Sequence, residues 1–226
     1  MFKVKLWCLF LFLALLNLTS PAGAFIVINE FLADPPAGLA GDANGDQTGS
    51  SSGDEFIELF NRGESAVDLS GWALSDNTKI RHVFQDGDVI LPDNVFVVFG
   101  GGTPVFDEFS WQVASSGGLG LNNTGDSILL ADAAGMGVDF VEYAQEANAN
   151  QSLVRFPEGT PGAAFIQHAS FPGGNSLPFS PGFMVASPPH SASVPEPLSI
   201  LGLGWGMIFG LAFKHGFFTK YFFENF

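Results

Sequence analysis

The side chains with the clearest chemical pattern lie in a polar loop, residues 33–55, which reads ADPPAGLAGDANGDQTGSSSGDE. Asp42, Asn44 and Asp46 stand at alternate positions, and Asp54 follows near the end of the loop. An Asp-x-Asn-x-Asp series supplies the first three oxygen ligands of many Ca²⁺ loops, because carboxylates and amide carbonyls suit a hard cation. The pattern therefore predicts a Ca²⁺ site made by Asp42, Asn44, Asp46 and Asp54.

The same loop departs from the complete EF-hand pattern. Position six is Gln47 where that pattern has Gly, and position twelve is Gly53 where it has Glu. β-rich runs flank the loop, whereas an EF-hand needs helices. A looser site that also uses Asp34 is one interpretation, and a solvated acidic loop built from good turn residues is the other.

Candidate catalytic residues are few. His82 stands in an apolar run, and neither His82 nor His168 lies in a hydrolase or metalloprotease frame. We expect Glu55 and Glu58 to be outward strand positions, with Glu58 facing water, and not a glycosidase pair. Trp111 is a candidate for carbohydrate stacking, with ordinary packing as the alternative. We predict a non-enzymatic protein; the alternative is a small secreted Ca²⁺-dependent hydrolase or an accessory domain for a partner enzyme.

The elements that position these residues are predicted to be strands. Helical periodicity is nearly absent after residue 24, while glycine and proline are frequent, which favours an all-β domain. Trp72 follows a glycine that suits a bend, so we expect it to be a core residue. The β-rich runs, separated by turn residues, cover 25–32, 54–61, 67–74, 82–84, 95–99, 127–130, 138–143 and 152–156.

The N-terminus has the pattern of a secretory signal peptide. Two lysines precede an apolar run over 6–16, and the small-residue triplet Ala22-Gly23-Ala24 follows. We predict a signal peptide over 1–24 that is cleaved after Ala24. The single cysteine of the chain, Cys8, lies inside this segment, so the predicted mature protein has no thiol and no disulfide.

The C-terminus carries a second targeting pattern. Pro195, Glu196 and Pro197 precede an uncharged apolar run over 198–213, and a short basic stop follows. We predict a transmembrane helix at 198–213, although its 16 residues fall just short of the usual spanning length. The segment 195–226 resembles the PEP-CTERM sorting signal, which implies an exosortase-type processing enzyme as a partner. The alternative is an ordinary single-pass anchor that is not processed.

The charge of the predicted mature core, residues 25–197, argues against one class of partner. This core holds 4 basic and 22 acidic residues, a net charge of −18. Such a charge repels phosphates, so nucleic-acid binding is not expected. Within this core, the Pro/Gly/Ser-rich stretch 158–194 is predicted to be a poorly ordered spacer, part of which is pinned to the domain by Phe165, Ile166, Phe171 and Phe179.

Five separated motifs occur in a fixed order: VINEFLAD, DEFIELFN, VDLSGWALSD, LNNTGDSILLAD and VDFVEYA. Together they resemble the lamin tail domain over residues 26–157. The resemblance implies an immunoglobulin-like β-sandwich over 25–157, with Trp72 in its core and Asn123 and Asp126 as turn formers. It implies a fold and not a mechanism.

The predicted function follows from these parts. We expect an exported protein of the cell envelope or extracellular space, anchored in the membrane through 198–213 at least transiently. Its role is predicted to be that of a surface adhesion or interaction module. The resemblance to the PEP-CTERM signal implies an extracellular polysaccharide matrix as a partner, and another surface protein is the alternative.

Overall fold

The computed structural model describes residues 26–172 and 176–185. Within these ranges there are twelve strands and three short 3-10 helices but no α-helix, which confirms the all-β prediction. The 3-10 helices are η2 (Gly38–Gly41), η3 (Gln145–Ala147) and η4 (His168–Ser170). The strands are β1 (Ile26–Leu32), β2 (Phe56–Asn61), β3 (Val67–Asp68), β4 (Ala73–Ser75), β5 (Ile80–Val83), β6 (Val89–Ile90), β7 (Val95–Phe99), β8 (Ser110–Val113), β9 (Asp126–Ala131), β10 (Gly137–Tyr143), β11 (Leu153–Phe156) and β12 (Ala164–Gln167).

The predicted targeting segments fall outside the described residues. These are the signal peptide 1–24 with its cleavage site at Ala24, and the sorting segment 195–226 with its apolar run 198–213. Among the residues that the structure does describe, no helix has the length and apolar character needed to cross a membrane.

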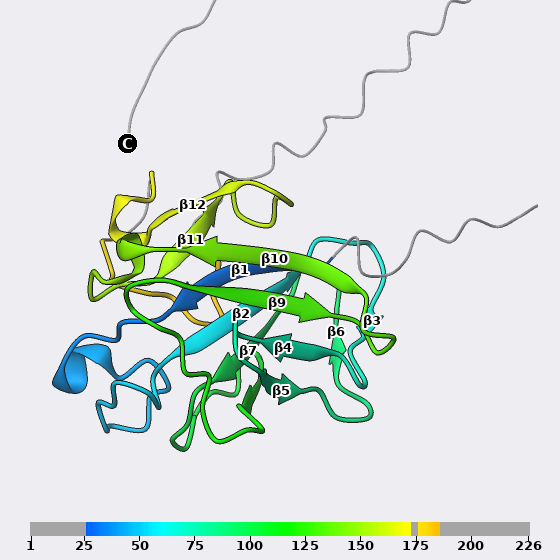
Figure 1. The fold of residues 1–226 in the computed structure, drawn as a ribbon, viewed down its shortest axis with the longest axis horizontal. Helices are drawn as coiled ribbons and strands as arrows, with labels where there is room; N and C mark the ends of the chain where they lie inside the picture. Colours follow the sequence, from blue (N-terminus) through cyan, green and yellow to red (C-terminus); the bar gives the residue numbers. More distant parts are fainter. Residues whose placement is uncertain (1–25, 173–175, 186–226) are drawn as a thin grey trace, which may run out of the picture. The chain divides into compact units, whose positions relative to one another are not determined.

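The strands form three sheets. The largest has the order β12-β11-β1-β2-β7-β8, the second has the order β10-β9-β4-β5, and β3 pairs with β6. All pairings are antiparallel except that of β7 with β8. Figure 1 shows the four-stranded sheet passing across the six-stranded sheet, so the two present broad faces to each other.

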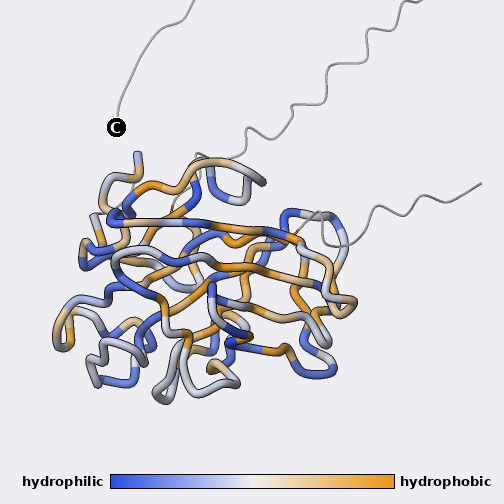
Figure 2. Tube along the Cα trace, in the orientation of Figure 1, coloured by the Kyte–Doolittle hydropathy of each residue, from blue (hydrophilic) through white to orange (hydrophobic). Residues whose placement is uncertain are grey.

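The main core is formed by residues of both larger sheets. Ile28 and Leu59 from the six-stranded sheet join Leu74, Ile128 and Leu130 from the four-stranded sheet, and all five are fully buried. Trp72 belongs to the same cluster, as the sequence predicted. Figure 2 shows apolar residues running along the strands and hydrophilic residues gathering in several of the connecting loops.

One side of the core is closed by a buried ion pair between the two sheets. Arg155 on β11 places its Nη2 atom 2.7 Å from Oδ2 of Asp139 on β10. That carboxylate also accepts a hydrogen bond of 2.8 Å from the Ile28 amide, and the guanidinium lies 4.6 Å from the Phe165 ring centroid. The ion pair therefore joins β11 of the six-stranded sheet to β10, an edge strand of the four-stranded sheet.

The opposite face of the six-stranded sheet is also covered. We call its apolar side chains the outer cluster: Leu32, Ala43, Phe56, Val97 and Phe99 are buried there, and Phe106, Phe109, Trp111 and Phe179 pack against them. Strand β2 therefore buries both faces, with Phe56 in the outer cluster and Ile57 and Leu59 in the main core. This double burial differs from the half-exposed sheet that simple alternation indicates.

The folded unit continues beyond residue 157, where composition placed the start of a spacer. Strand β12 pairs with β11, and Phe165 lies opposite Arg155. Phe165 packs against the main core, while Ile166 and Phe171 join a small cluster with Val154. The predicted contacts of Phe165, Ile166 and Phe171 with the domain are thus present, and the described residues extend to 185.

Candidate functional site

The loop 33–55, which connects β1 to β2, is organised by one buried acid. Asp54 is fully buried, and its Oδ1 accepts hydrogen bonds from the amides of Ala43, at 2.9 Å, and Asn44, at 3.1 Å. Its Oδ2 accepts a hydrogen bond of 2.7 Å from the Ser50 amide. Burial raises the pKa of Asp54, and these three amides act in the opposite direction. Asp54 therefore holds the ends of the predicted Ca²⁺ loop together.

Asp42 occupies the first position of the predicted Ca²⁺ pattern. Its Oδ2 accepts a hydrogen bond of 2.8 Å from the Gln47 amide. Its Oδ1 is buried and has no hydrogen-bond partner among the described residues. Gln47 has φ of 66°, a left-handed conformation that usually belongs to glycine. The sharp turn that Gly provides at position six of a Ca²⁺ loop is therefore present despite the Gln.

Asn44 and Asp46 fasten the loop to the chain after β7. The Asn44 Nδ2 donates to the Gly101 carbonyl at 3.2 Å, and Oδ2 of Asp46 accepts from the Thr103 amide at 3.0 Å. Gly102 lies between these contacts, and a Cβ atom there would be 2.2 Å from Asn44 Nδ2. The glycines after β7 thus permit close approach of the loop.

The structure brings Asp42, Asn44, Asp46 and Asp54 into one folded loop. Asp34, which the looser site also used, instead accepts hydrogen bonds from Asn123 Nδ2 at 2.6 Å and the Asn150 amide at 3.0 Å. Across residues 26–172 and 176–185 there is no group of three or more His, Cys, Asp or Glu side chains arranged to hold a metal.

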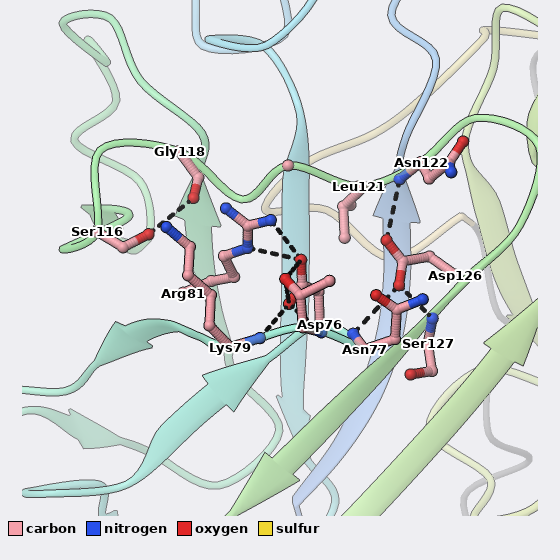
Figure 3. A network of polar contacts seen from close by, with 12 residues as sticks. Asp76, Asn77, Lys79, Arg81, Ser116, Gly118, Leu121, Asn122, Asp126 and Ser127 are labelled. Atoms are coloured by element: carbon pink, nitrogen blue, oxygen red, sulfur yellow. Dashed lines mark hydrogen bonds and ion pairs between the residues drawn. The ribbon is translucent and has the colours of Figure 1, made fainter.

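A second polar network joins the end of β4 to the segment before β9. Figure 3 shows the carboxylates of Asp76 and Asp126 on either side of Asn77. Asp76 forms an ion pair with Arg81, and Oδ2 of Asp76 lies 2.7 Å from Arg81 Nε. Asp126 accepts hydrogen bonds from the amides of Asn77, at 3.2 Å, and Asn122, at 3.2 Å. The predicted turn-forming role of Asp126 is confirmed by these contacts.

The pKa values of two acids in this region, Asp76 and Glu55, shift in opposite directions. Burial would raise the pKa of Asp76, but hydrogen bonds from Arg81 and from neighbouring amides lower that pKa to about 2. Glu55 forms no such ion pair within the part of the chain that the structure describes. Its Oε2 accepts from the amides of Gly120, at 2.7 Å, and Leu121, at 3.3 Å, while burial raises its pKa to about 7.

Glu30 and Glu58 lie on the outer face of the six-stranded sheet, and Glu158, which follows β11, shares the Asn29 side-chain amide with Glu58. We call these three glutamates the carboxylate cluster. Glu30 and Glu58 stand directly opposite each other on β1 and β2, and both are fully buried. The expectation that Glu58 faces water is therefore wrong. Its side chain does point away from the main core, but residues 176–185, here called the strap, cover it.

The strap supplies hydrogen-bond donors to all three glutamates. The Ser180 amide donates to Oε1 of Glu30 at 2.9 Å, and the Gly182 amide donates to Oε2 of Glu58 at 2.8 Å. The Val185 amide donates to Oε1 of Glu158 at 3.0 Å. No sequence motif indicated this arrangement, because its partners are 27 to 150 residues apart.

Other residues considered from the sequence have packing roles in the described fold. Trp111 is half-buried against the outer cluster, and its Nε1 donates to the Phe106 carbonyl at 2.9 Å. His82 is buried on β5 with its ring edge-on to Phe84. His168 is buried in η4, with Nε2 2.9 Å from the Ser180 hydroxyl.

The family model described as Lamin Tail Domain matches residues 19–145, which is 127 of the 226 residues of the chain. A search of curated proteins found no match.

Proposed function

The chain belongs to the lamin tail domain family, and from that premise we propose that it is a non-enzymatic interaction module tethered outside the cell. The family implies an immunoglobulin-like sandwich, and the core shared by the two larger sheets supports that interpretation. Family membership supplies a fold and not a mechanism, so the function must be argued from the features around the domain.

One observation carries the proposal: a compact, acidic β-domain stands between an export pattern and a sorting pattern. Residues 1–24 have the order of a signal peptide, and Pro195-Glu196-Pro197 precedes the apolar run 198–213. The residues that the structure describes run to Val185, ten residues before Pro195. A protein built in this way is exported and held at the envelope, where an exosortase-type enzyme is the expected processing partner.

The direct test is localisation of the full chain in a host that processes PEP-CTERM proteins. Replacing Pro195, Glu196 and Pro197 with Ala should leave the protein in the membrane fraction at its unprocessed mass. The unchanged chain should reach the surface and be digested by protease added to intact cells. A shortened, surface-exposed triple-Ala variant would show that the motif is not the sorting signal.

The proposed partner is a neutral or cationic component of the extracellular matrix, such as a polysaccharide, or another surface protein. The net charge of −18 on residues 25–197 favours such partners over anionic ones. Co-sedimentation of the purified full chain with isolated matrix polysaccharide tests this part. Recovery of the chain in the soluble fraction at every polysaccharide concentration would redirect the proposal to a protein partner.

We also propose that Ca²⁺ binds the loop 33–55. Oδ1 of Asp42, which is buried without a hydrogen-bond partner among the described residues, and the left-handed turn at Gln47 support the proposal, because both fit the start of a Ca²⁺ loop. Ca²⁺ at about a hundredfold excess over its Kd would add roughly 2.7 kcal/mol to the free energy of unfolding. The full chain should therefore melt at a higher temperature in Ca²⁺ than in chelator, and the D42A/D46A variant should not.

The exposed Asp86 offers a matched control, since D86A changes the charge outside the loop. It should keep the full Ca²⁺ response. Equal melting temperatures of the unchanged chain in Ca²⁺ and chelator would exclude a stabilising site. Hydrolysis of a polysaccharide or peptide by the unchanged chain, with loss of that activity in D42A/D46A, would instead support the Ca²⁺-dependent hydrolase alternative.

A further inference from the structure

The strap and the carboxylate cluster form one continuous contact. Each of the three glutamates accepts a hydrogen bond from a strap amide, and Glu30 also accepts one of 2.8 Å from the Ser180 hydroxyl. Aromatic contacts flank these bonds. Phe179 packs edge-on against Phe56 with ring centroids 6.5 Å apart, and Phe183 packs edge-on against Phe109 at 5.8 Å.

No basic side chain neutralises the cluster among the described residues. The buried cation of the same sheet, Arg155, directs its guanidinium to the carbonyls of Ile28 and Ala163 and to Asp139. The other groups that face the cluster are neutral. Asn29 Nδ2 bridges Glu58 and Glu158 at 2.9 Å and 3.3 Å. Closing the strap therefore encloses three acids without a counter-charge.

Two further side chains complete the surroundings of Glu30. The Ser152 hydroxyl donates to Oε1 of Glu30 at 2.6 Å. His168 is the one titratable group that contacts the same strap residue from η4, and it reaches the Ser180 hydroxyl and not the carboxylate. Burial lowers the pKa of His168, which favours its neutral form and removes it as a source of positive charge.

This environment favours the protonated acids. Burial raises the pKa of Glu30 to about 7 and that of Glu158 to about 7. For Glu58, burial and then the neighbouring Glu30 charge raise the pKa well above its ordinary value. An ionised pair directly opposite on adjacent strands is destabilising, which acts in the same direction. The three glutamates therefore hold protons while the strap is closed and release them when it opens.

We propose that Glu30, Glu58 and Glu158 form a proton-controlled latch that keeps the strap on the outer face of the six-stranded sheet at acidic pH and releases it as pH rises. Opening lets water solvate the carboxylates and uncovers apolar surface of the outer cluster. Between pH 4.5, the ordinary carboxyl pKa, and about pH 7, the closed form binds more protons than the open form. Rising pH therefore favours opening.

Release of the strap would also lengthen the connection to residue 195. Ten freed residues add up to roughly 35 Å of extended chain. This consequence rests on the proposed tether, whereas the latch itself depends only on the contacts around the three glutamates. Failure of the localisation experiment would therefore leave the latch intact, and failure of the latch would leave the tether intact.

The test is hydrogen exchange of the full chain between pH 5 and pH 8, corrected for the intrinsic rate of amide exchange. Each proton released on opening changes the opening equilibrium by about tenfold per pH unit. Protection of peptides that cover 178–185 should fall at least about tenfold across this window. Protection of β7 should exceed that of the strap at every pH, because its hydrogen bonds belong to the central sheet and break only when the whole domain unfolds. Equal protection of β7 and the strap at every pH would show that both open only by global unfolding, which would overturn the proposal.

Glu58→Gln and Glu158→Gln provide the decisive variants. Each keeps the shape of the side chain but removes a proton that can be lost, so each should flatten the pH dependence of strap protection. Glu142→Gln alters an exposed glutamate on β10 and should retain the pH dependence of the unchanged chain. Should Glu58→Gln fail to fold, as reported by β7 exchange, the half-buried Glu158 still gives the answer. A pH dependence unchanged in a folded Glu158→Gln variant would overturn the latch.

Discussion

The loop 33–55 and the strap both involve buried acids, but they satisfy those acids in different ways. In the loop, Asp54 binds amides only 4 to 11 residues away in the sequence. In the strap, Glu30 and Glu58 bind amides 150 and 124 residues away. Hydrogen bonds to local amides form whenever the loop forms. Hydrogen bonds to the distant strap amides exist only while the strap is docked. Acids of the first kind stabilise a local structure, and acids of the second kind make docking depend on protonation.

Asp54 is the acid on which the loop 33–55 depends most. Asp54→Ala removes the acceptor of three amides, two of which are in fully buried hydrogen bonds. Unsatisfied buried donors cost about 1–3 kcal/mol each, so the free energy of unfolding should fall by about 4 kcal/mol. Denaturant unfolding of the full chain measures this. A loss below about 1 kcal/mol, similar to that of the D86A control, would contradict the role assigned to Asp54.

Glu30 makes the stability of the strap side depend on pH. Glu30 has its pKa raised to about 7, so ionisation destabilises the fold as pH rises from about 4.5 to 7. Glu30→Gln should remove this loss. Relative to the unchanged chain, the variant should gain about 2 kcal/mol in unfolding free energy between pH 5 and pH 8. Urea unfolding at both pH values tests the prediction, and a constant difference between the two proteins would refute it.

Asp76 has the opposite pH response to Glu30. The pKa of Asp76 is lowered to about 2, so its stabilising contribution is present above its ordinary pKa of 3.8 and is lost as pH falls toward 2. Arg81→Ala removes the main partner and should cost about 1–2 kcal/mol at pH 7. The cost should shrink below pH 3. Thermal melting at pH 7 and pH 2.5 would show it, and an equal cost at both pH values would argue against the ion pair.

The smallest expected effect separates strap docking from global stability. Phe183 is half exposed and contacts Phe109 from the strap. Phe183→Ala should lower the unfolding free energy by no more than about 1 kcal/mol, since an aromatic pair contributes about that much. Exchange of the strap amides should nevertheless rise several-fold while amides of the loop 33–55 keep their protection. Equal acceleration in both regions would show that the strap and the loop open as one unit.

Sequence reasoning located the loop because its signal is local. The alternate Asp42, Asn44 and Asp46 and the later Asp54 lie within 13 consecutive residues, and loop contacts follow from such spacing. It missed Glu30 and Glu158, because an isolated glutamate carries no spacing pattern. The sequence also predicted that Glu58 faces water. Alternation along a strand indicates which face a side chain occupies, but it does not indicate what covers that face.

By itself, the sequence determined an all-β domain with Trp72 in its core, since turn residues and period-two patterning are properties of short segments. Only the tertiary structure decided that the outer face of β1 and β2 is covered. The strap covers it. From its composition the strap was predicted to be part of a spacer, because proline, glycine and serine are common in docked segments of this kind as well as in spacers. Burial of Glu58 depends on the amide of Gly182, 124 residues later, and no local pattern encodes a contact across that separation.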